Sequence, residues 1–143
     1  MSKKFNPWAR HQSRRALVQA LYQWQLTAAL TEDLEQQFLK DAKPRRFDRE
    51  FFSKVLHGVL VGHERMDKLF SPYLDRQISE LDQVEKAILR LGTYELSECI
   101  DVPFRVVVDE YIELAKTFGA EDSFKYINGI LDSVGHELRG DSR

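Results

Sequence analysis

The segment from Asp101 to Leu138 constrains the fold most, because its apolar residues recur every three or four positions on both sides of Phe118-Gly119-Ala120. This spacing places side chains on one face of a helix. The two series are Phe104, Val107, Tyr111, Leu114 and Phe118, then Phe124, Ile127, Leu131, Val134 and Leu138. Gly119 suits the left-handed end of a helix, and Asp122 or Ser123 can cap the next one. The segment predicts an αα-hairpin.

Apolar spacing together with helix start and stop signals indicates further helices along the rest of the chain. We expect further helices from Ala9 to about Ala28, from Thr31 to before Pro44, from Asp48 through Gly62, from Glu64 to Leu69, and from Asp82 to about Ser97. Gly58 and Gly62 allow a close helix contact or a bend. The run Val106-Val107-Val108 favours a strand by residue type, but no alternation surrounds it. The sequence therefore predicts an all-α fold of about seven helices.

A chain of 143 residues is long enough for one domain with one core, so we expect residues 1–143 to form a single domain. We expect residues 1–8 to be a flexible basic arm. No apolar run approaches the roughly 20 residues that span a bilayer. No secretory signal follows Lys3 and Lys4, and the single Cys99 cannot form an intramolecular disulfide. These features predict a protein of the reducing cytoplasm, with no membrane partner.

Charge is distributed unevenly along the chain. Residues 1–31 contain five Lys or Arg and no acid, whereas the remainder has 16 basic and 23 acidic residues, a net charge of −7. A basic arm on an acidic body indicates a nucleic-acid or other anionic partner. Arg10 and Arg14 fall on the same side of the first helix as its apolar stripe. Because an unpaired guanidinium is unstable in a core, we expect these first turns to overhang the body and face solvent or a ligand.

The basic start of the first helix is the first candidate binding site. Arg10 with Arg14, and His11 with Arg15, are four residues apart and so lie along one side of a helix, and Gln19 adds hydrogen-bonding groups. These side chains can grip phosphates. The alternative is an ordinary solvated helix end.

Lys125 and Tyr126 are the second candidate site, because both lie off the centre of the apolar face of the last helix. A tyrosine can stack on an unpaired base while a lysine meets phosphate. Packing at the edge of the core is the alternative for Tyr126, and the same two interpretations apply to Tyr73. Asp122 is expected to cap the helix. Its carboxylate would also repel the phosphates of a nucleic acid that passes this helix end, so Asp122→Asn should strengthen such binding.

The sequence contains few residue patterns that would indicate an enzyme. The four histidines lack metal-ligand spacing, and no glycine-rich phosphate loop is present. Glu110 and Glu113 lie one turn apart, but Lys116 follows them, which is typical of a solvated, salt-bridged face. We expect no catalysis, no metal and no cofactor.

Several motifs together resemble the family of the bacterial transcription antitermination factor NusB. They are the basic run from Arg10 to Arg15, Ala20-Leu21-Tyr22-Gln23-Trp24-Gln25, Gln83-Val84-Glu85-Lys86-Ala87-Ile88-Leu89-Arg90, Tyr94-Glu95-Leu96, Asp101-Val102-Pro103-Phe104, Glu113-Leu114-Ala115-Lys116, Phe118-Gly119-Ala120-Glu121-Asp122-Ser123 and Asn128-Gly129. The resemblance covers nearly the whole chain in order. It implies two packed helical bundles, the first three helices against the last four.

The resemblance also implies a function. NusB-like proteins pair with NusE, a ribosomal small-subunit protein, and the pair holds the single-stranded boxA element of nascent RNA. The complex joins RNA polymerase and the other Nus factors and supports rRNA transcription. Family members carry a denser arginine cluster than this chain, in which His11, Gln12 and Ser13 interrupt the run. We therefore expect RNA affinity to rest on Arg10, Arg14, Arg15 and the lysines of the arm.

Glu80, Asp82 and Glu85 form the candidate partner surface, because ribosomal proteins are basic and acids provide steering and register. The alternative for Glu85 is that it merely closes a capping box with Asp82, and the two roles can coexist. Two other functions stay open. NusB-like domains also occur in front of rRNA methyltransferases, where they aid substrate binding, although this chain ends soon after its last helix. The second open function is that of a protein scaffold without RNA affinity. A homodimer of the free protein is also open.

Overall fold

The computed structural model describes residues 5–43 and 45–140, which contain helices and no strand. The α-helices are α1 (Pro7–Thr27), α2 (Thr31–Leu39), α3 (Arg49–Phe70), α4 (Gln83–Glu98), α5 (Phe104–Phe118) and α6 (Ser123–Arg139). Two 3₁₀ turns, η1 (Ser71–Tyr73) and η2 (Ile78–Glu80), lie between α3 and α4. The all-α prediction is confirmed, with one α-helix fewer than the expected seven in the described ranges.

The missing helix boundary lies within α3. The helices expected before and after Gly62 are two helical segments of α3 joined at a kink, where Gly62 leaves helical geometry (φ −103°, ψ 17°). Gly58 lies so close to the Tyr94 ring of α4 that a Cβ atom would overlap it. The predicted bend and the predicted close contact are both confirmed.

Helix α1 begins earlier than expected. The Asn6 side chain accepts a hydrogen bond from the Ala9 amide (3.0 Å), and Pro7 occupies the first turn, where its missing N–H costs nothing. The prediction of an arm extending to Trp8 is therefore wrong, because Pro7 and Trp8 are helical. The rest of the arm, with Lys3 and Lys4, lies outside the described residues, as does Pro44.

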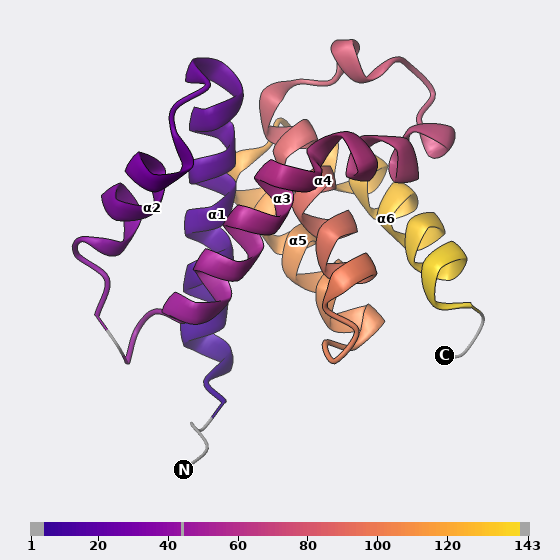
Figure 1. Ribbon diagram of the computed structural model, residues 1–143. Coiled ribbons are helices and arrows are strands. Elements are labelled where there is room, and N and C mark those ends of the chain that lie inside the picture. Colours follow the sequence, from indigo (N-terminus) through magenta and orange to yellow (C-terminus); the bar gives the residue numbers. More distant parts are fainter. Residues whose placement is uncertain (1–4, 44, 141–143) are drawn as a thin grey trace.

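The helices form two groups around a shared core (Figure 1). Helices α1 and α2 lie on one side and α4, α5 and α6 on the other, while α3 runs from α1 and α2 across to α4 and α6; α1 also packs against α4. The buried apolar residues form a continuous cluster that includes Leu17, Phe52, Leu91 and Tyr111. The predicted pair of bundles is confirmed, and α1 is placed to present one face to the core and another to solvent.

Candidate nucleic-acid interface

Arg14 lies buried where α1 meets α4 and α5. Its guanidinium donates to both carboxylate oxygens of Glu95 (2.8 and 2.9 Å) and to Glu110 (3.0 Å). Burial opposes its charge, but the hydrogen bonds and charge of Glu95 outweigh burial and raise the pKa of Arg14. The prediction that Arg14 faces solvent is wrong, because carboxylates from the other bundle pair with the guanidinium inside the protein.

Tyr111 completes this buried network. Its hydroxyl donates to Glu95 at 2.5 Å, and burial, followed by the charge of Glu95, raises the pKa of Tyr111 well above its usual value. At the exposed edge, His11 Nδ1 lies 3.0 Å from the Glu110 oxygen that also accepts from Arg14. The network joins α1 to α4 and α5, so it fixes how α1 is oriented on the second bundle.

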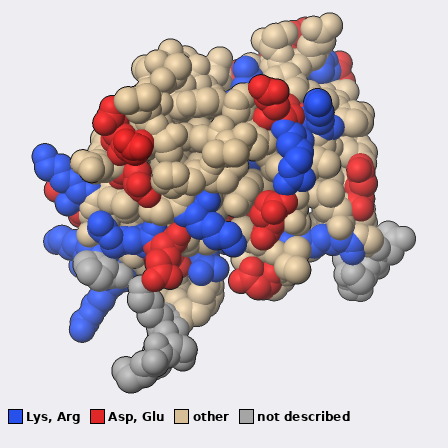
Figure 2. All heavy atoms as spheres, viewed as in Figure 1, with Lys and Arg blue, Asp and Glu red and all other residues tan. Residues whose placement is uncertain are grey.

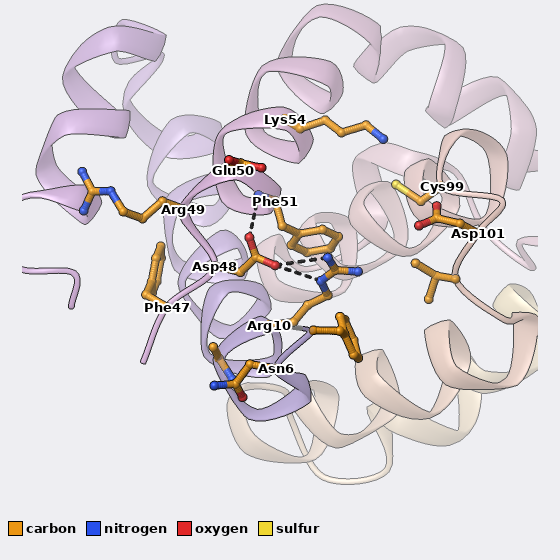
Figure 3. Close-up of a pocket in the computed structure, with 13 residues that line it drawn as sticks. Asn6, Arg10, Phe47, Asp48, Arg49, Glu50, Phe51, Lys54, Cys99 and Asp101 are labelled. Atoms are coloured by element: carbon orange, nitrogen blue, oxygen red, sulfur yellow. Dashed lines mark hydrogen bonds and ion pairs between the residues drawn. The ribbon is translucent and has the colours of Figure 1, made fainter. Parts of the chain in front are cut away.

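Arg10 is also paired. Its guanidinium donates to Asp48 (3.1 and 3.2 Å) and lies 4.6 and 4.5 Å from the ring centroids of Phe5 and Phe51. Figure 3 shows Arg10 pointing toward Asp48 beside a hollow of about 500 Å³. Its side chain is only 20% exposed. The expected overhang of the first turns is wrong for Arg10 too, because α3 begins beside it and supplies a carboxylate.

The opposite side of α1 presents an exposed row, which we call the outer stripe: Trp8, Gln12, Arg15 and Gln19. These residues step by four, three and four positions and so lie along one line of the helix. Trp8 is 53% exposed, Arg15 and Gln19 are exposed and Gln12 is half-buried. The Arg15 guanidinium stacks over the Phe118 ring at 5.3 Å, and no described carboxylate forms an ion pair with it. The outer stripe therefore keeps its charge and its amide groups available.

The contact between Arg15 and Phe118 joins the two sites predicted from sequence. Phe118 ends α5, and α6 begins five residues later at Ser123. Lys116 and Lys125 flank Phe124, with their ammonium groups 4.9 and 5.9 Å from its ring centroid. The start of α1 and the start of α6 are thus brought to one region of the surface.

Asp122 does not cap α6 with its side chain. Its backbone is left-handed (φ 68°), whereas Gly119 is extended (φ −87°), so the expected roles of the two residues in the turn are wrong. Aspartate tolerates a left-handed backbone because its short side chain can bond locally. The Asp122 carboxylate lies 3.5 Å from the Lys125 ammonium. Asp122 therefore neutralises a cation at the surface.

Tyr126 and Tyr73 are both tied to neighbouring segments. The Tyr126 hydroxyl donates to Asp75 (2.8 Å), and the Arg76 guanidinium covers its ring at 4.4 Å. Burial, followed by the hydrogen bond to Asp75, raises the pKa of Tyr126. Tyr73 donates to Glu137, about 20 Å along α6 from its start at 1.5 Å per residue. Of the two, only Tyr126 lies near Lys125, and its ring is partly occupied.

The acidic residues at and before the start of α4 differ in exposure: one is buried and hydrogen-bonded, and two are exposed. Glu85 is buried, accepts hydrogen bonds from the Asp82 amide (3.3 Å) and the Ser123 hydroxyl (3.0 Å), and closes the predicted capping box. The capping role of Glu85 is confirmed, and the residue is 8% exposed and presents little surface to a partner. Glu80 and Asp82 remain exposed.

Sequence reasoning missed a second basic element beside α1. Lys43, Arg45 and Arg46 lie between α2 and α3 and are exposed. Figure 2 shows Lys and Arg side chains gathered at the lower left, over this segment. The local run of basic residues was a signal for it, but nothing in the sequence placed the run against the outer stripe. Trp8 was missed because it was assigned to the arm.

Three further features of the described residues concern metal binding, thiol reactivity and membranes. In residues 5–43 and 45–140, no group of three His, Cys, Asp or Glu side chains could hold a metal ion. Burial raises the pKa of Cys99 to about 11, so its thiol is protonated and unreactive. No α-helix in the described ranges has the length and apolar content to cross a membrane.

Comparison with known proteins identifies a family. The model of the NusB family matches residues 11–136. Transcription antitermination protein NusB of Alcanivorax borkumensis is 55% identical over 139 residues, 97% of this chain and 93% of that protein. The protein of the same name from Pectobacterium carotovorum is 50% identical over 133 residues, covering 93% and 96%.

Solved structures agree with this match. A structure of T. maritima NusB superposes with a TM-score of 0.78 at 34% identity, over 96% of this chain and 94% of that one. A structure of the antitermination factors NusB and NusE in complex with dsRNA gives a TM-score of 0.80 at 23% identity, over 92% and 99%. At that identity the second likeness shows the fold alone.

Proposed function

The chain belongs to the NusB family, and on this basis we propose that it is a transcription antitermination factor. With NusE it binds the boxA element of nascent RNA, joins the elongating RNA polymerase and other Nus factors, and supports rRNA transcription. It works as a single-domain adaptor in the cytoplasm and catalyses no reaction. The names of its relatives support this assignment, and the fold agrees with it.

The observation that carries the proposal is the division of the cations on α1. Arg10 and Arg14 are paired with carboxylates, whereas Arg15 on the outer stripe has no ion pair among the described residues. A cation already neutralised by a carboxylate gains little from a phosphate, whereas an unpaired one releases counterions when it binds. The outer stripe is thus the part of α1 suited to RNA.

The start of α6 extends this surface. Arg15 stacks on Phe118, and Lys116 and Lys125 are exposed beyond it. The Lys125 pair with Asp122 is solvent-exposed and therefore weak, so cations continue from α1 across the α5–α6 turn. Cations along a groove or ridge can track the phosphates of a single strand. Arg14 supports this surface by holding α1 against α4 and does not contact the RNA itself.

Glu80 and Asp82 provide the surface for NusE. Both are exposed, and they precede α4 on the same side as the start of α6, where Glu85 bonds Ser123. A basic ribosomal protein is complementary to these acids. This placement lets one partner lie beside the RNA strand.

A titration of labelled boxA RNA and of a scrambled RNA, with and without NusE, tests the proposal. We expect binding that weakens with salt, favours boxA and strengthens when NusE is present. The salt dependence reports the number of phosphates contacted, so it should fall when Arg15 is replaced. Absence of RNA binding both with and without NusE would refute the function.

A further inference from the structure

A hollow of about 400 Å³ lies between the outer stripe of α1 and the segment joining α2 to α3. We call it the linker hollow. Trp8, Gln12, Arg15 and Gln19 form one wall, and Asp41, Lys43 and Arg46 line the other. Ala16, Ala42 and Phe47 supply apolar surface. This volume falls within the range of small-ligand pockets and accommodates one nucleobase.

The polar groups of the linker hollow are not used by the fold. In the described part of the chain, the Gln12, Gln19 and Asp41 side chains have no hydrogen-bond or ion-pair partner, whereas Arg10, Arg14 and Glu85 are all paired. Two amides and a carboxylate offer both donors and acceptors. Unused groups of this kind around a concave apolar surface are what recognition of a base edge requires.

The arrangement of charge indicates which part of a nucleotide enters. Arg15, Lys43 and Arg46 lie around the hollow without ion-pair partners among the described residues, so they favour phosphates. Asp41 repels a phosphate but accepts hydrogen bonds from the exocyclic amino group of a base. A phosphate therefore belongs at the cations and an amino-bearing base edge belongs at Asp41.

We propose that the linker hollow receives one unpaired RNA base carrying an amino group, stacked on Trp8 and hydrogen-bonded by Asp41, while Arg15, Lys43 and Arg46 hold the flanking phosphates. Cytosine, adenine and guanine satisfy this requirement, and uracil, which presents only carbonyl acceptors and one ring N–H, does not. This inference rests on the RNA binding proposed above and adds a base-reading position to it.

Substitution of Asp41 tests the reading of the base. Single-stranded boxA RNAs, in which one cytosine, adenine or guanine at a time is replaced by uridine, are titrated against the full chain with NusE at fixed salt. We expect one position at which uridine weakens binding about tenfold. Asp41→Asn should abolish that discrimination, because an amide can donate to the uracil carbonyl. Asp109→Asn on α5 is the control, since it makes the same charge change at an exposed residue.

Two outcomes separate failure of this inference from failure of the function. RNA binding that discriminates at no position, or Asp41→Asn that alters every RNA alike as Asp109→Asn does, would refute the base-reading hollow and leave antitermination intact. Absence of RNA binding in the unmodified protein would refute the function itself.

Fluorescence provides a measurement that does not depend on Asp41. The chain has two tryptophans, so Trp24→Phe leaves Trp8 as the sole reporter. Stacking of a base should quench Trp8 emission on addition of boxA RNA, and RNA with an abasic site at the discriminated position should not quench it. Equal quenching by both RNAs would contradict stacking in the hollow.

Discussion

Arg14 and Arg15 are neighbours in the sequence, yet they belong to different parts of the molecule. Consecutive residues of a helix point about 100° apart, so one faces α4 and the other faces solvent. Arg14 is 3% exposed and holds two carboxylates, whereas Arg15 rests on an aromatic ring with no described ion-pair partner. The difference teaches that a basic run alone does not define an RNA surface. Which arginines bind RNA depends on where the carboxylates lie.

The largest expected effect is on stability and concerns Arg14, the buried arginine. Arg14→Ala leaves the buried Glu95 carboxylate without its cation, so the free energy of unfolding should fall by about 3–5 kcal/mol. Urea unfolding followed by circular dichroism measures it. Arg15→Ala serves as the control and should change stability by no more than about 0.5 kcal/mol. Equal losses in the two variants would remove the distinction between the two faces.

The acidic segment before α4 offers the same comparison with the opposite charge. Glu85→Ala removes the capping-box acceptor and the bond from Ser123, so we expect a loss of about 1–2 kcal/mol in unfolding free energy. Glu80→Lys, at an exposed residue, should instead weaken NusE binding with little change in stability. Thermal and urea unfolding and isothermal titration with NusE distinguish the two. A larger loss of stability in the Glu80 variant would contradict the assignment.

Replacement of Arg15, on the outer stripe, should weaken RNA binding with little change in the free energy of unfolding. Arg15→Ala is expected to weaken boxA and scrambled RNA alike, by about tenfold at low salt, and to reduce the salt slope by about one. Titrations at several salt concentrations measure both quantities. Arg10→Ala is the matched variant, since Asp48 already neutralises that guanidinium. If Arg10→Ala proved the more damaging to binding, the outer stripe would not be the RNA surface.

The smallest expected effect concerns the surface cation at the start of α6. Asp122→Asn removes the partner of Lys125 and a charge that repels phosphate, so RNA should bind several-fold more tightly. Asparagine also tolerates the left-handed backbone at this position, so the turn should persist. A titration at fixed salt suffices. Unchanged or weaker affinity would show that RNA does not pass Lys125.

The helices could be predicted from sequence because their signals are local. Three-four spacing located every α-helix, and the Asp82–Glu85 capping box was evident from four consecutive residues. The two segments of α3 were expected as separate helices, and the kink at Gly62 lies between them; glycine identity alone does not say whether a helix ends or only bends there. The left-handed Asp122 was missed for a similar reason, since neighbouring Gly119 was the more usual choice.

The site was harder to predict because its contacts are distant in sequence. A guanidinium is not buried unpaired, but the partners of Arg14 are Glu95 and Glu110, which lie 81 and 96 positions away and so could not be found from local sequence. The linker hollow depends in the same way on how Lys43 and Arg46 fold back against α1. Charge patterning pointed to α1 as the candidate RNA surface, and only the three-dimensional arrangement separated its paired face from its available one.

The bond between Ser123 and Glu85 has a further consequence. It links the first turn of α4, which follows the acids assigned to NusE, to the first turn of α6, which carries Lys125. When NusE binds the start of α4, the Ser123–Glu85 hydrogen bond also restrains the start of α6. The protein then loses less conformational entropy when RNA binds there. Thermodynamic linkage makes this exchange symmetric. If NusE raises the affinity for RNA by some factor, RNA raises the affinity for NusE by the same factor.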